Sequence, residues 1–260
     1  MAGAESKAVI GDFLMAPKRI SPRSRPCTRR GIGNSPFRVP RIQMTKPLPP
    51  EGLLQSLGEE IANSLSSGIG LMAVIAGIPL LVGSAIQRRN EFSLAGAIVF
   101  AAAMVTLYLT STIYHALPRG RIKRLFRLFD HSAIFLLIAG TYTPFALGAL
   151  RGVWAWTLFG VLWCLAILGI GFKAFGGLKY RWLSILLYVC MGWMALFAIR
   201  LFWLRVGFQG LLWIISGGLA YTSGIAFYLA KRLPYSHLIW HLFVSAGTAC
   251  HFCAVLWYAG

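Results

Sequence analysis

The chain has 260 residues, of which 57% are hydrophobic and only 12% are charged, and its formal net charge is +18. Soluble domains carry about 25% charged residues, so this composition excludes an ordinary soluble protein and predicts an all-α, polytopic membrane protein. Apolar runs near 20 residues indicate helical spans, whereas a membrane barrel would show alternating segments of about ten. The basic residues lie in the N-terminal stretch and between apolar runs, so they indicate membrane orientation and no nucleic-acid partner.

Residues 1–50 hold ten Lys and Arg, two acidic residues and no sustained apolar period. This composition predicts a disordered, basic, cytoplasmic tail ahead of a membrane domain at residues 51–260. The stretch lacks the apolar core of a signal peptide, and its Arg and Ser content leaves an organelle transit peptide open as an alternative. A second alternative is that translation begins at Met44, since the membrane character starts only a few residues later.

Seven apolar runs follow the tail, and each is long enough for a transmembrane helix. Gly, Ala and Ser are frequent inside these runs, which favours close helix packing in lipid, and Trp and Tyr near several ends are typical of interfacial anchors. The predicted spans are 63–86, 92–115, 130–150, 153–172, 182–203, 209–230 and 237–257.

The distribution of basic residues predicts the orientation of these spans. If the N-terminus is inside, the loops after spans two, four and six hold ten Lys and Arg, the tail adds ten more, and the outer side holds five. The positive-inside rule therefore predicts an inner N-terminus and an outer C-terminus. This topology brings the end of span two and the starts of spans three and seven to the same inner membrane depth.

Histidines occur at this depth on two spans. Span two ends at His115, and span seven begins with His237 and His241, whose spacing of four places both rings on one helix face. Three neutral imidazoles with an open fourth position are typical of a catalytic zinc site, so zinc is the predicted cofactor. We expect His131 to pack beside the site. His251 lies ten residues beyond His241, too far along the helix to share the metal.

Two polar residues are candidates for the chemistry. Asp130 is the only acidic residue after position 91. A carboxylate beside a membrane span is costly unless paired or functional, so we predict that Asp130 orients or deprotonates a metal-bound water. The structural alternatives are a salt bridge with Arg127 or a helix cap. Ser111 shares a helix face with His115 and can bond that water, a substrate carbonyl, or a carbonyl of its own helix.

Two further pairs of residues have structural explanations. Glu60 and Asn63 share a face at the start of span one, where they can cap the helix or line the site. Cys250 and Cys253 resemble a CxxC pair, but no second pair exists, and we expect them to be small packing residues.

Three motifs in this order, on seven predicted spans, resemble those of haemolysin III proteins, the bacterial branch of the progestin and adipoQ receptor family. The similarity covers residues 59–258. The motifs are Ser111-xxx-His115, Asp130-His131 followed by Ala139-Gly140-Thr141-Tyr142-Thr143-Pro144-Phe145, and His237-xxx-His241.

The resemblance implies a seven-helix fold in the bacterial inner membrane. It implies zinc held by His115, His237 and His241, with Asp130 and Ser111 at the zinc water. It also implies a metal-dependent hydrolase, with amide bonds of lipids such as ceramide as substrates in the receptor branch. The family links the bacterial branch to cytolysis and to membrane homeostasis.

The first span departs from the family pattern. Glu60 and Asn63 match it, but Ser67 stands where a histidine is expected. That histidine is not one of the three implied ligands, so metal binding is expected to persist. The change puts in question a proton relay or a substrate contact made from the first span.

The sequence therefore predicts an intramembrane zinc hydrolase that acts on a lipid amide or ester, with membrane lipids and a zinc ion as its partners. Two alternatives stay open: a pore-forming cytolysin or channel, and a zinc-stabilised receptor or scaffold without turnover. A pore should repeat polar residues along several spans, whereas spans four to six are largely apolar and aromatic. Neither the substrate nor an oligomeric state follows from the sequence.

Overall fold

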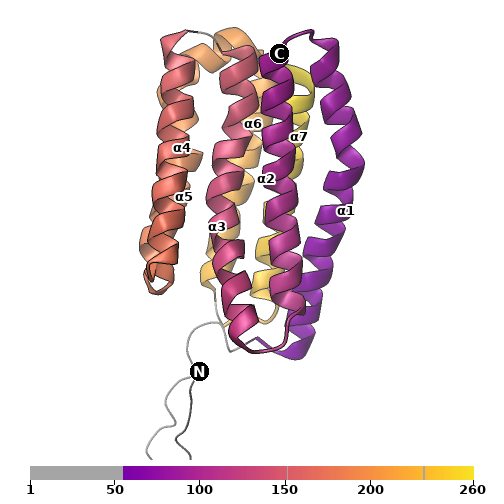
Figure 1. The fold of residues 1–260 in the computed structure, drawn as a ribbon, viewed down its shortest axis with the longest axis vertical. Helices are drawn as coiled ribbons and strands as arrows, with labels where there is room; N and C mark the ends of the chain where they lie inside the picture. Colours follow the sequence, from indigo (N-terminus) through magenta and orange to yellow (C-terminus); the bar gives the residue numbers. More distant parts are fainter. Residues whose placement is uncertain (1–54, 151, 231) are drawn as a thin grey trace, which may run out of the picture. The chain divides into compact units, whose positions relative to one another are not determined.

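The computed structural model describes residues 55–150, 152–230 and 232–260. The predicted basic tail at residues 1–50 and the start at Met44 lie outside the described residues. All regular structure in the described part is helical (Figure 1). The α-helices are α1 Leu57–Gln87, α2 Glu91–Ala116, α3 Arg121–Pro144, α4 Val153–Ala174, α5 Arg181–Gly192, α6 Ile199–Leu229 and α7 Ser236–Tyr258; the shorter turns are η1 Phe145–Ala149, η2 Gly177–Lys179 and η3 Met194–Ala198.

Six helical segments of the described chain are long and apolar enough to cross a membrane, so the protein is a multi-pass integral membrane protein. The longest segment, Arg181–Leu229, contains α5, η3 and α6. Its backbone is not one regular helix, because Gly207 adopts φ 74° and ψ 177°. Residues with a side chain rarely adopt a positive φ, which explains the glycine. The predicted interval between spans five and six contains Gly207, but the 3₁₀ turn η3 was not predicted.

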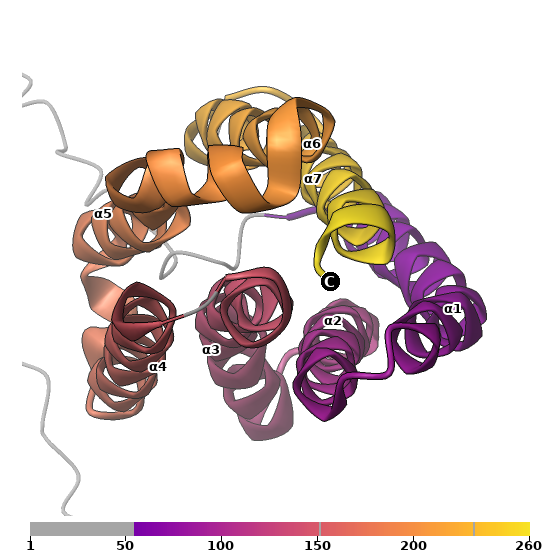
Figure 2. The same cartoon turned by 90° about the horizontal axis from the view of Figure 1, so that it is seen from above.

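The first and last helices run in the same direction. At their start, the Tyr235 amide donates a hydrogen bond to the Glu59 carboxylate (2.9 Å). At their end, the Arg88 guanidinium donates to the carbonyl oxygens of Val255 (3.1 Å) and Leu256 (2.8 Å). Figure 2 shows α7 between α6 and α1, so the last helix closes a bundle in which the other helices follow one another in chain order.

Two helices begin earlier than predicted. α3 begins at Arg121 rather than at residue 130, because residues 121–129 alternate basic and apolar side chains at helical spacing and continue the helix beyond the apolar run. Asp130 consequently lies inside α3, so the suggestion that it caps this helix was wrong. α1 begins at Leu57 rather than at residue 63, because Ser56 and Glu59 form a capping box.

Glycine allows α2 and α3 to pack closely. A Cβ on Gly96 would lie 2.6 Å from the Pro144 Cα, and a Cβ on Gly140 would lie 2.7 Å from the Ala103 Cβ. Small residues at helix interfaces are typical of membrane bundles, where close contact replaces the hydrophobic driving force. This contact packs α2, whose last turn contains His115, against α3.

Candidate metal centre

Three histidines meet at the end of the bundle where α2 ends and α7 begins. His115 lies in the last turn of α2, and His237 and His241 lie in the first turns of α7. One ligand nitrogen of each ring lies within 4.8 Å of the other two. The ring centroids are 4.7–5.1 Å apart. The fold therefore brings together the three residues that the sequence predicts as metal ligands.

The His115 ring is oriented by a carboxylate from α1. Its Nδ1 lies 2.8 Å from Oε2 of Glu60, and Oε1 of the same carboxylate lies 3.1 Å from the Lys123 ammonium. Because a carboxylate accepts, His115 donates from Nδ1 and keeps its lone pair on Nε2. His115 Nε2 is fully buried and has no hydrogen-bond partner in the described part of the chain. A buried nitrogen lone pair without a donor is what a metal ligand requires.

The His241 ring is oriented by two serines of α1. Its Nδ1 lies 3.1 Å from the Ser66 hydroxyl and 3.0 Å from the Ser67 hydroxyl. Ser66 donates its own proton to the Asn63 carbonyl (2.9 Å), so its oxygen accepts from His241 Nδ1. This direction leaves the lone pair of His241 on Nε2. Both rings with assigned hydrogen bonds thus hold the tautomer that binds a metal through Nε2.

The donor set fits a zinc ion. Two nitrogens on a tetrahedral zinc lie about 3.4 Å apart when each Zn–N bond is about 2.0–2.1 Å. The limit of 4.8 Å between the three nitrogens exceeds this separation by about 1.4 Å, which small side-chain rotations can close. Neutral imidazoles without a carboxylate disfavour magnesium and calcium, which prefer oxygen ligands.

The two predicted catalytic residues line a cavity of about 300 Å³, and so do His237 and His241. Asp130 and Ser111 are both buried. The Ser111 hydroxyl lies 3.0 Å from the Ser67 hydroxyl, so Ser67 contacts both Ser111 and His241. The position that departs from the family pattern therefore joins two residues of the site by hydrogen bonds.

Asp130 lies beside the histidine group rather than in it. Its Oδ2 lies 3.4 Å from His131 Nδ1, without the geometry of a hydrogen bond. His131 is half-buried and lines the same cavity, which agrees with a residue packed beside the site. His251 also lines the cavity but stands outside the histidine group, as its distance along α7 predicted. Cys250 and Cys253 are free thiols.

Sequence reasoning missed the contacts made by α1. The sequence leaves two roles open for Glu60, a helix cap or a part of the site, and the structure separates them: Ser56 and Glu59 cap α1, and Glu60 contacts His115. The spacing Ser56-xx-Glu59 is a recognisable capping signal that frees the neighbouring glutamate for the site. No sequence signal marks Ser66 and Ser67 as partners of His241, because serines are common in membrane helices.

Comparison with known proteins finds a family model that matches most of the chain. The family model described as "Haemolysin-III related" matches residues 55–252. The chain is 40% identical to "Hemolysin-3" of Bacillus cereus over 206 residues, which cover 79% of this chain and 94% of that protein. It is 37% identical to "Hemolysin-3 homolog" of Bacillus subtilis (strain 168) over 203 residues, 78% of this chain and 95% of that protein.

A more distant similarity extends to animals. The human "Monocyte to macrophage differentiation factor" is 26% identical over 191 residues, which cover 68% of this chain and 77% of that protein. The matched region 55–252 contains the three histidines, Asp130 and Ser111. On the extent of the family match and the identity to the bacterial relatives, the chain belongs to the haemolysin-III related family.

Proposed function

We propose that the protein is a metal-dependent membrane hydrolase that holds zinc with His115, His237 and His241 and cleaves a lipid amide or ester. The observation that carries the proposal is the convergence of three imidazole nitrogens within 4.8 Å at the edge of a cavity. Three neutral imidazoles leave one coordination position for a water or a substrate, which is the arrangement of catalytic rather than structural zinc.

Bound zinc would lower the pKa of a coordinated water toward about 7 and polarise a carbonyl. Asp130, which lines the same cavity, accepts a proton from the attacking water as general base. As the water oxygen bonds to the carbonyl carbon and the C–N or C–O bond breaks, Asp130 returns that proton to the leaving group. Ser67 can donate to Ser111, which leaves the Ser111 proton free for the substrate carbonyl oxygen.

We propose seven spans with the N-terminus inside, in the bacterial plasma membrane. Support comes from the parallel direction of α1 and α7, because an odd number of crossings puts the first and last helices in the same direction. It also comes from Gly207, whose backbone breaks the segment Arg181–Leu229. At about 1.5 Å per residue, 49 residues exceed one bilayer crossing more than twofold.

Metal analysis of detergent-purified protein tests the proposal. We expect about one zinc per chain in the parent protein and a loss of stoichiometric zinc in His237→Ala. Asp130→Asn should retain the zinc and lose hydrolysis of a short-chain ceramide or an acyl ester. A parent protein without zinc, or with zinc that His237→Ala leaves unchanged, would refute the metal site. Retained zinc without turnover in the parent would favour a zinc-stabilised receptor or scaffold.

Membrane lysis is the second candidate, because the relative that is 40% identical is named "Hemolysin-3". A pore and a hydrolase differ in how osmotic protectants act on treated cells. Protectants above a sharp size limit prevent lysis by a pore of fixed diameter, whereas lysis through lipid cleavage shows no such limit. We expect no size limit, together with loss of lysis in Asp130→Asn.

A further inference from the structure

The cavity beside the histidines is lined by positively charged side chains from α3, α4 and α5. Lys173 near the end of α4, Arg181 at the start of α5 and Arg127 of α3 all line it. Glu59 and Asp130 are the carboxylates that line it among the described residues. The cations exceed the carboxylates by one before any metal binds.

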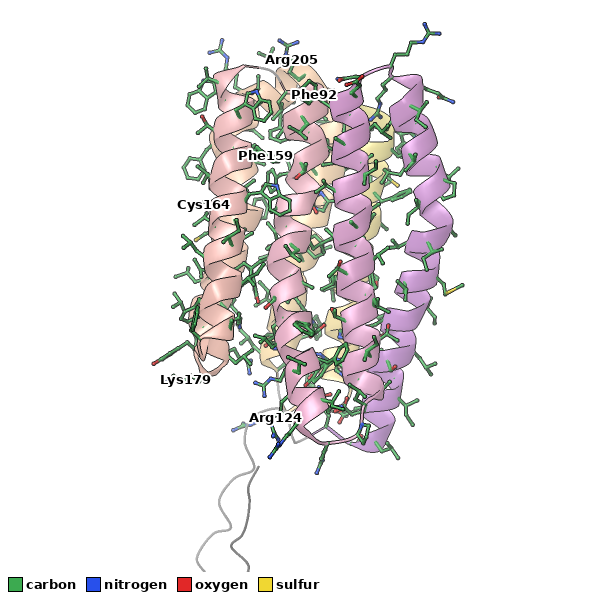
Figure 3. All side chains as sticks on the ribbon, viewed as in Figure 1. Phe92, Arg124, Phe159, Cys164, Lys179 and Arg205 are labelled. Atoms are coloured by element: carbon green, nitrogen blue, oxygen red, sulfur yellow. The ribbon has the colours of Figure 1, made fainter. Side chains whose placement is uncertain are left out.

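Lys173 differs from the basic residues that set membrane orientation. Its exposed fraction is only 2%, although residues with an orienting role sit at the surface. Lys179, six positions later, is exposed and points away from the helices at the same end (Figure 3). No carboxylate of the described chain lies within 4 Å of the Lys173 ammonium. Arg127 adds to the cost, because its positive charge repels that of Lys173.

Arg181 links this charged wall to the histidines. It donates a hydrogen bond to the Tyr228 carbonyl (3.1 Å), and its guanidinium carbon lies 4.7 Å from the centre of the Tyr228 ring. The same ring lies 6.0 Å from the His237 ring between centroids, with the two planes tilted by 46°. Arg181 Nε is buried and has no hydrogen-bond partner among the described residues. Tyr228 therefore contacts both Arg181 and one of the three histidines.

Buried cations without a counter-charge are costly, and an anion supplied by a ligand removes that cost. A phosphate monoester carries about −1.5 to −2 charge and three acceptor oxygens, which suits several cations better than a singly charged carboxylate. The remaining wall is largely apolar and includes Ile134, Ile138 and Val189. A cavity with one cationic end and an apolar body is complementary to a single-chain lipid with a phosphate headgroup.

We propose that Lys173 and Arg181 form a binding site for the phosphate headgroup of a single-chain lipid inside the cavity that the histidines border. The binding site stands independently of turnover. The further suggestion that such a lipid is the substrate, with its acyl bond beside the histidines, rests on the proposed function above.

Native mass spectrometry of the full chain in neutral detergent tests this site. The probes are lysophosphatidic acid, monoolein, which has the same acylglycerol without the phosphate, and inorganic phosphate. We expect one lysophosphatidic acid per chain, bound at least tenfold more tightly than monoolein or inorganic phosphate. Lys173→Gln should weaken this binding at least tenfold. Lys173→Arg keeps the positive charge and should bind as tightly as the parent. Lys179→Gln is the matched control and should bind as the parent does.

Arg181→Gln provides an independent variant and should also weaken binding of lysophosphatidic acid. Equal binding by Lys173→Gln and Lys179→Gln, or monoolein binding as tightly as lysophosphatidic acid, would overturn the proposal. Inorganic phosphate binding as tightly would show that the lipid is not the ligand. His237→Ala should keep the binding. Binding in the absence of any lipid hydrolysis would refute the hydrolase and leave this site standing.

Discussion

At the scale of single residues, the hydrogen bonds on the far side of each histidine ring decide what the ring can do. A histidine that donates from Nδ1 to a carboxylate is a stronger metal ligand through Nε2, because the carboxylate fixes the tautomer and raises the basicity of the ring. Glu60 is placed for this function on His115, and Lys123 in turn holds Glu60. We therefore propose that this carboxylate is a positioning residue that would not touch a bound metal itself.

Glu60→Gln tests this positioning role. The amide keeps the size of the side chain but loses the charge, so we expect zinc affinity to fall by about 10–100-fold. Competition with a chelator of known affinity measures the change. Glu91→Gln, which removes an exposed carboxylate at the start of α2, is the matched control and should leave affinity unchanged. Equal affinities for Glu60→Gln and Glu91→Gln would contradict the role.

The serines that contact His241 are partly redundant, since both hydroxyls lie within hydrogen-bond distance of the same Nδ1. Ser66→Ala and Ser67→Ala should each lower zinc affinity only a few fold, and the double variant should lower it by more than the product of the two. The energy of a neutral hydrogen bond, about 0.5–1.5 kcal/mol, sets this scale. The same chelator competition provides the double-mutant cycle, and strictly additive effects would argue against a shared role.

Ser67 has a second effect that Ser66 does not share. Its hydroxyl also lies 3.0 Å from that of Ser111, which we propose contacts the substrate carbonyl. If the proposed function holds, Ser67→Ala should reduce turnover more than Ser66→Ala at equal zinc occupancy. The comparison requires saturating zinc, so that the effect on Ser111 is separated from the effect on His241. Equal turnover in the two variants would leave Ser67 as a partner of His241 alone.

At the scale of the helices, the sequence predicts features that depend on residue spacing within one helix. Features that depend on contacts between helices do not follow from it. The spacing of His237 and His241 is enough to place both rings on one face of α7. The positions of Glu60 and Ser66 opposite those rings depend on the rotation of α1, which a largely apolar helix does not reveal in its sequence. α3 shows the opposite limit: its first turns are charged, so a hydropathy pattern starts the span only after the helix has begun.

The close contact between α2 and α3 at Gly96 should contribute measurably to the stability of the bundle. Gly96→Ala would put a Cβ 2.6 Å from the Pro144 backbone, so we expect destabilisation of about 1–3 kcal/mol. A thermal unfolding scan in detergent should show a lower midpoint. Gly83→Ala in α1 has open space within 4 Å and serves as the control; its midpoint should stay equal or rise. If the unfolding midpoint fell equally in both variants, the loss of stability would come from replacing a helical glycine in general and not from the contact with Pro144.

At the scale of the whole molecule, direction and charge point to the same topology. The starts of α1 and α7 share one end of the bundle with the histidines, and their ends share the other. Figure 3 shows Arg124 and Lys179 at the end where α1 begins and Arg205 at the opposite end. In the described part of the chain, the end with the histidines carries the larger share of the basic residues, and the positive-inside rule therefore supports our proposal that this end faces the cytoplasm.

Single cysteines at exposed positions test this topology in the intact membrane. Lys179→Cys and Arg205→Cys place one thiol at each end, in a chain whose five native cysteines are replaced by alanine. A charged maleimide does not cross the bilayer, so we expect it to label Arg205→Cys in intact cells and Lys179→Cys only after the membrane is opened. The reverse pattern would put the metal centre at the outer face, and labelling of both thiols in intact cells would refute an odd number of crossings between the positions.

Because a metal centre at the inner face draws its ion from the cytoplasm, the expected pattern also predicts that an impermeant chelator removes zinc from opened cells and leaves it in intact ones.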